Sequence, residues 1–155
     1  MDKDAEAKLA AALTRRRTAV TRLELEKAAA EKALAEKSAR KDASRQRWAM
    51  SLQEIGAAIE SVNERLRGDG LQLKIAEASQ ATPPAIAQLY IVLHDEKAPD
   101  VKNRQLVLNI SAYGKAQPRA YGPHALGKID DFEINEADQG KYEQVLSEFV
   151  ALVFS

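Results

Sequence analysis

Glycine and proline are distributed very unevenly along this chain, and their distribution constrains its fold more than any other feature. Residues 1–67 contain no proline and a single glycine, Gly56, whereas the other six glycines and all five prolines fall in residues 68–155. The first region consists mostly of Ala, Leu, Glu, Lys, Arg and Gln, which are the strongest helix formers. We therefore expect a long helical arm over residues 1–67 and a small, turn-rich head domain over residues 68–155.

The first half of the arm carries apolar residues at coiled-coil spacing. The predicted seam consists of Leu9, Leu13, Val20, Leu23 and Leu34. Ala30 also lies on this seam, but Arg16 and Lys27 interrupt it. The pattern predicts self-association of the arm, as a homodimer, and leaves open whether the paired helices run parallel or antiparallel.

The second half of the arm has a stronger apolar pattern. Steps of three and four residues separate Trp48, Leu52, Ile55, Ile59, Val62 and Leu66, without a polar interruption. The step from Trp48 to Leu52 departs from the register of the first half and resembles a stutter. Because a head of 88 residues with few aromatic side chains has a marginal core, we expect residues 48–66 to pack against it.

Residues 37–44 are the weakest part of the helical pattern. They fit either a solvated stretch of one continuous helix or the corner of a helical hairpin, in which Asp42 or Ser44 would cap the second helix. The lack of glycine and proline in this stretch favours a continuous helix.

The sequence of the head domain predicts several short strands followed by a helix. Alternating apolar residues predict strands near residues 71–75, 86–94 and 104–113, with Leu71, Leu73 and Ile75 facing the same way. A turn is expected at 114–118, a short fourth strand at 119–121, and a C-terminal helix that starts near Asn135. The connections are too short for parallel crossovers. The fold class is therefore α+β: a long N-terminal helix, a small antiparallel sheet of three or four strands, and a C-terminal helix.

No motif in the sequence indicates a catalytic chemistry. The chain has no cysteine, which excludes disulfides and thiolate nucleophiles. Its two histidines, His94 and His124, match no catalytic or metal-binding spacing, so we expect no catalytic residue, no metal ligand and no cofactor. No secretory signal and no run of about 20 apolar residues is visible. A cytoplasmic protein without a membrane span is the expectation.

One loop region could form a ligand or partner surface. It comprises Tyr113, Arg119, Tyr121, His124 and Lys128, which combine aromatic rings, positive charge and flanking glycines. A small-ligand binder or an enzyme centred on residues 113–128 is therefore one alternative function.

The arginines of the arm suggest a second alternative. Arg15, Arg16 and Arg17 could contact phosphates, and residues 1–67 hold 15 basic and 11 acidic residues against 8 and 12 in residues 68–155. Glutamates are interleaved with the basic residues, and no aromatic side chain accompanies them, so a nucleic-acid partner is not favoured. The favoured hypothesis is a non-enzymatic assembly or adaptor module, which self-associates through the arm and binds a protein partner through the head.

Overall fold

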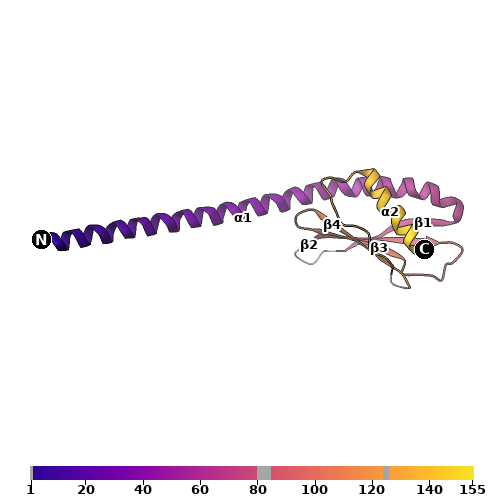
Figure 1. The fold of residues 1–155 in the computed structure, drawn as a ribbon. Coiled ribbons are helices and arrows are strands. Elements are labelled where there is room, and N and C mark those ends of the chain that lie inside the picture. Colours follow the sequence, from indigo (N-terminus) through magenta and orange to yellow (C-terminus); the bar gives the residue numbers. More distant parts are fainter. Residues whose placement is uncertain (1, 80–84, 124–125) are drawn as a thin grey trace. The chain divides into compact units, whose positions relative to one another are not determined.

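A computed structural model describes residues 2–79, 85–123 and 126–155, and it has the predicted α+β class (Figure 1). The elements are helix α1 (Lys3–Leu66), a short 3-10 helix η1 (Arg67–Asp69), strands β1 (Leu71–Ser79), β2 (Ala85–Asp95), β3 (Gln105–Ser111), β4 (Lys115–Tyr121) and β5 (Phe132–Glu133), and helix α2 (Gln139–Val153).

Helix α1 is continuous through residues 37–44, as the helix-forming composition predicted, and no hairpin corner interrupts it. It ends in η1, which Gly70 caps in the left-handed conformation with φ of 72°. The Gly70 N–H donates to the carbonyl of Arg67, and glycine adopts this conformation without a steric penalty.

The chain divides into two compact units, an N-terminal unit of residues 1–39 and a C-terminal unit of residues 40–155. The boundary falls inside α1, so the last part of this helix belongs to the C-terminal unit. Every residue from Asp2 to Ala39 is exposed.

The C-terminal unit is built on an antiparallel meander in the order β1-β2-β3-β4-β5. The predicted turn at 114–118 is wrong, because β4 already starts at Lys115 and includes Pro118. β5 pairs only with Lys115 and Ala116, so at Pro118 β4 behaves much like an edge strand on the side that faces β5. Proline has no backbone N–H to donate, and an edge strand tolerates this loss. β5 itself makes a fifth strand, one more than the three or four that the sequence predicted.

Both helices cover the same face of this sheet, as Figure 1 shows for α2 and the C-terminal part of α1. The core between them is formed chiefly by Ile55, Ala58, Ile59 and Val62 of α1, Leu73, Leu89, Ile91, Leu93, Leu106 and Leu108 of the sheet, and Tyr142, Val145, Leu146 and Phe149 of α2. Trp48 and Leu66 are partly buried against the same core.

Two residues assigned to buried faces are exposed instead. Leu52 is 36% exposed, and the residue that takes its place in the core-facing stripe is Ser51, which is fully buried. Ile75 is 43% exposed, because it lies on the edge strand β1 beside the register shift that separates it from Glu77.

The core-facing stripe of α1 follows a regular alternation of four and three residues: Ser44, Trp48, Ser51, Ile55, Ala58 and Val62. The predicted stutter at Trp48 to Leu52 is therefore wrong. Ser44 and Ser51 are both buried in this stripe. Ser44 packs closely against Gly114, because a Cβ on that glycine would lie only 3.3 Å from the Ser44 hydroxyl oxygen. The register is the same one that contains Leu9, Leu13, Val20, Leu23 and Leu34.

Helix α2 begins four residues after the predicted start at Asn135. Its N-cap is Asp138, whose carboxylate accepts a hydrogen bond of 2.9 Å from the backbone N–H of Lys141. Asp138 is the better cap because its side chain lies within reach of an unpaired N–H of the first turn.

Candidate functional site

The predicted seam of the N-terminal unit is a row of exposed apolar side chains. Leu9, Leu13, Val20, Leu23 and Leu34 range from 37% to 68% exposed. An exposed row of leucines on a helix is unusual for a surface without a partner, because each buried side chain of this size gains about 1.5 to 3 kcal/mol.

Leu25 is also exposed, but it lies outside the seam. It is 66% exposed, against 63% for Leu23, and the two differ only in their helical position. Leu25 therefore provides a matched comparison for the seam residue Leu23.

The second candidate site is the face of the sheet opposite the helices. Side chains alternate across each strand, so the register places the residues between the core positions on this other face. One row across the strands contains Lys74, Val92, Gln105 and Tyr121. The next row contains Tyr90, Val107 and Arg119. Among the described residues no helix covers this surface, which we call the open sheet face.

A shallow hollow of about 250 Å³ lies on the open sheet face. Its lining is Gln88, Tyr90, Gln105, Val107, Asn109 and Tyr121. Tyr121 is half exposed while Val107 is buried, so the phenol ring stands out and the valine forms part of the floor. A tyrosine ring can bury apolar area while its hydroxyl exchanges hydrogen bonds, and tyrosine is enriched where proteins meet.

The neighbouring Arg119 is held in place by a carboxylate. Its guanidinium nitrogen lies 3.0 Å from Asp131, which also pairs with Lys115 at 3.7 Å. Burial of the Asp131 carboxyl opposes its ionisation, but the hydrogen bond and charge of Arg119, with Lys128 and Lys115 nearby, hold the pKa of Asp131 below its ordinary value of 3.8. The charge of Arg119 is therefore partly compensated within the fold.

The structure brings together only part of the predicted ligand or partner surface. Arg119 and Tyr121 share the open sheet face, and Lys128 forms an isolated bridge with Arg119. Tyr113 lies at the opposite end of β4, in the turn after β3, where the guanidinium of Arg40 stacks over its ring at 5.0 Å. His124 lies outside the described residues.

Sequence reasoning missed the residues that the neighbouring strands contribute to this surface. Tyr90, Gln105 and Asn109 line the hollow, yet they lie outside residues 113–128. The alternation in each strand showed which residues share a face, but only the pairing of β2, β3 and β4 puts them beside Tyr121.

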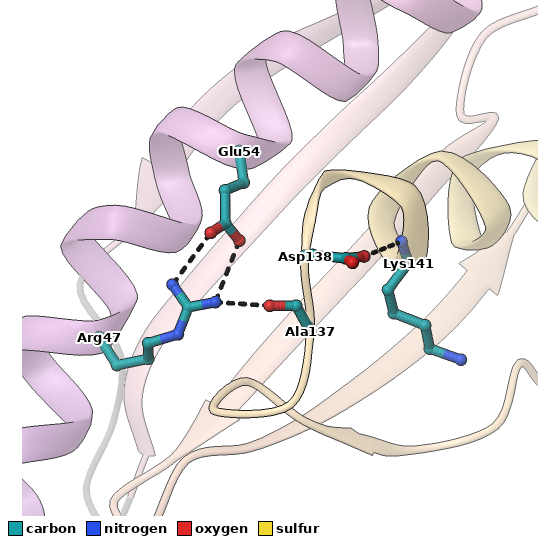
Figure 2. Close-up of polar contacts among 5 residues, drawn as sticks. All are labelled: Arg47, Glu54, Ala137, Asp138 and Lys141. Carbon is teal, nitrogen blue, oxygen red and sulfur yellow. Dashed lines mark hydrogen bonds and ion pairs between the residues drawn. The ribbon is translucent and has the colours of Figure 1, made fainter.

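A polar lock joins the two helices of the C-terminal unit (Figure 2). The two terminal guanidinium nitrogens of Arg47 each donate to a carboxylate oxygen of Glu54 at 3.2 Å, and one of them also donates to the carbonyl of Ala137. Ala137 immediately precedes the N-cap of α2, so Arg47 fixes the start of this helix against α1. The lock is partly buried and lies away from the open sheet face, which indicates a structural role.

His94 has an exposed side chain at the end of β2, where it lines a hollow of about 500 Å³ with Val92, Pro99 and Val101. In the part of the chain that the structure describes, no group of three or more His, Asp and Glu side chains could hold a metal ion. His94 therefore lies at a hollow on the protein surface.

Arg15, Arg16 and Arg17 are all exposed on the N-terminal unit. The nearest ion pair on that helix is the exposed contact of Arg22 with Glu26, at 3.9 Å. The three arginines are close in sequence but point to successive sides of the helix, because adjacent residues are about 100° apart.

The search for similar proteins gave no match: no family model matches the chain, and neither a curated protein nor a solved structure does. None of the helices, over the described residues, has the length and apolar character needed to span a membrane.

Proposed function

We propose that this protein is a non-enzymatic assembly module, which self-associates through residues 3–39 and presents its C-terminal unit to a protein partner. The observation that carries the proposal is the exposed row of apolar side chains at coiled-coil spacing. The C-terminal unit has a core of its own, made by α1 from Ser44 onward, the sheet and α2, so it does not need these leucines.

A second copy of the chain is the partner that best fits the seam. It offers an apolar row with the same spacing, which allows both rows to be buried along their whole length. Isolated helices gain little stability from propensity alone, so the helix of residues 3–39 benefits directly from such a contact. Arg16 and Lys27 weaken the seam, which favours a dimer that dissociates on dilution.

Sedimentation of the full chain over a range of concentrations tests self-association. The unmodified protein is expected to form a dimer, and Leu23→Glu is expected to shift the equilibrium toward monomer by at least tenfold because it places a charge in the seam. Leu25→Glu should leave the equilibrium nearly unchanged. A monomeric wild-type chain, or equal effects of the two variants, would contradict the proposal.

The open sheet face is the surface that we assign to the protein partner. It fits a protein surface of mixed character, since it combines two tyrosines with the amides of Gln105, Asn109 and Gln117. A photo-reactive amino acid in place of Gln105 should cross-link one defined protein in cells. The adduct should disappear with Tyr121→Ala and persist with Tyr113→Ala, which removes a similarly exposed tyrosine at the other end of β4. An adduct that does not depend on Tyr121 would refute this assignment.

A further inference from the structure

We propose that the two copies of residues 3–39 pair antiparallel, in the register that places Leu9 of one copy opposite Leu34 of the other. This inference rests on the proposed self-association and specifies its geometry. It depends on the seam positions of one continuous helix whose residues 3–39 are all exposed, because these positions fix which residues meet in each arrangement.

The apolar layers match completely in this register. Leu9 faces Leu34, Leu13 faces Ala30, and Val20 faces Leu23, each twice because the dimer is symmetric. A slip of one heptad destroys the match. In one direction Leu9 meets Lys27, and in the other it meets Lys41. The antiparallel pairing therefore has a single favourable register.

The charged seam positions favour the antiparallel arrangement over the parallel one. In a parallel dimer in register, each residue faces its own copy, so Glu6, Arg16, Lys27 and Lys37 would form four layers of like charge. In the antiparallel dimer Glu6 faces Lys37, which turns two of these repulsive contacts into attractive ones. Arg16 faces Lys27, and this layer stays repulsive in both arrangements.

The residues that flank the seam favour the same arrangement. Parallel pairing places Glu26 of one copy beside Glu31 of the other, which is a like-charge contact. Antiparallel pairing instead brings Arg17 beside Glu24, an opposite-charge contact that occurs twice. Such exposed pairs contribute only a few tenths of a kcal/mol each, but they discriminate between two arrangements with equal apolar burial.

The arrangement has a consequence for assembly. Because residues 3–39 pair along their length, the two copies of Arg40 lie at opposite ends of the paired segment, about 55 Å apart at 1.5 Å per residue. Two partners bound to the dimer would then be held apart. In the parallel arrangement they would be attached at the same end.

Disulfide trapping in the full chain tests the inference, and the natural lack of cysteine removes any background. An oxidised mixture of Leu9→Cys and Leu34→Cys chains should give the mixed dimer, and neither variant alone should cross-link. Leu13→Cys with Ala30→Cys is a second pair, which keeps most of the seam leucines. Leu25→Cys serves as a control that should not react.

The other possible results of cross-linking and sedimentation distinguish an error in the pairing from an error in the proposed function. If Leu9→Cys and Leu34→Cys each cross-link with themselves, the pairing is parallel and the inference is wrong, while self-association stands. A dimer in sedimentation without any of these cross-links overturns the register. A chain that sediments as a monomer overturns the proposed function itself.

Discussion

Asn63 on α1 forms two hydrogen bonds with the backbone of Leu73 on the edge strand β1. The side-chain amide donates to the Leu73 carbonyl at 3.0 Å, and the side-chain oxygen accepts from the Leu73 N–H at 2.7 Å. The asparagine thereby takes the place that a neighbouring strand would occupy. Edge strands with unpaired backbone groups invite pairing with other chains, so this contact both fixes α1 and protects the edge.

Asn63→Asp is expected to lower the free energy of unfolding by about 1 to 3 kcal/mol. The variant keeps the size of the side chain, but its carboxylate faces the Leu73 carbonyl and cannot donate. Urea unfolding followed by Trp48 fluorescence, at one fixed protein concentration, measures the effect. Gln53→Glu makes the same chemical change at an exposed position of α1 and should alter stability by less than about 0.5 kcal/mol. Equal effects of the two variants would show that the Leu73 contact contributes nothing.

The polar lock predicts a contrast between two arginines that lie two residues apart. Arg47→Met should lower the free energy of unfolding by about 1 to 3 kcal/mol, because it leaves Glu54 and the Ala137 carbonyl without their donor in a partly buried site. Arg45→Met removes only an exposed pair with Asp42 at 3.6 Å and should cost less than about 1 kcal/mol. Urea midpoints of the two variants provide the measurement, and a larger loss for Arg45→Met would contradict the assignment.

The lowered pKa of Asp131 predicts a dependence of stability on pH. The folded state favours the carboxylate, so the contribution of Asp131 is present above its unfolded pKa and is lost as pH falls through its folded pKa. Asp131→Asn should therefore be less stable than wild type at pH 7, by a few tenths to about 1 kcal/mol, because the group is near the surface. The difference should begin to narrow as pH falls below about 4 and should close once pH is below the folded pKa of Asp131. Asp130→Asn, at an exposed neighbouring residue, is the control, and a gap that persists at low pH would refute the ion-pair explanation.

The sequence predicted those features that depend on periodicity and composition. The uninterrupted α1, the antiparallel sheet and α2 all follow from helix-forming residues, alternation and short connections. The residues that were placed wrongly are those whose burial or strand pairing depends on contacts with parts of the protein that are distant in the chain. Ser51 replaces Leu52 in the core stripe, where apolarity alone would choose the leucine. Pro118 lies within β4 because β5 pairs with only two of its residues.

The residues of the open sheet face could likewise be predicted only in part from the sequence. Tyr121 and Arg119 could be singled out from their local sequence, but Tyr90 and Asn109 join them only through strand pairing. A register between strands depends on side-chain packing over the whole sheet, and local alternation does not specify it.

Two glycines of the C-terminal unit should respond to alanine in opposite ways. Gly114 has φ of 86°, and a Cβ there would lie 3.3 Å from both Ile134 and Ser44, so Gly114→Ala should lower the free energy of unfolding by at least about 1 kcal/mol.

Gly56 lies inside α1, and a Cβ there would have no atom within 4 Å. Gly56→Ala should therefore raise the free energy of unfolding by about 0.5 to 1 kcal/mol, because alanine loses less conformational entropy than glycine when the helix forms. Urea unfolding of both variants beside wild type, at equal protein concentration, measures the two changes. A loss of stability in Gly56→Ala would mean that another surface approaches α1 at this position, and the full chain should then be compared at high and low concentration to find out whether that surface belongs to a second copy.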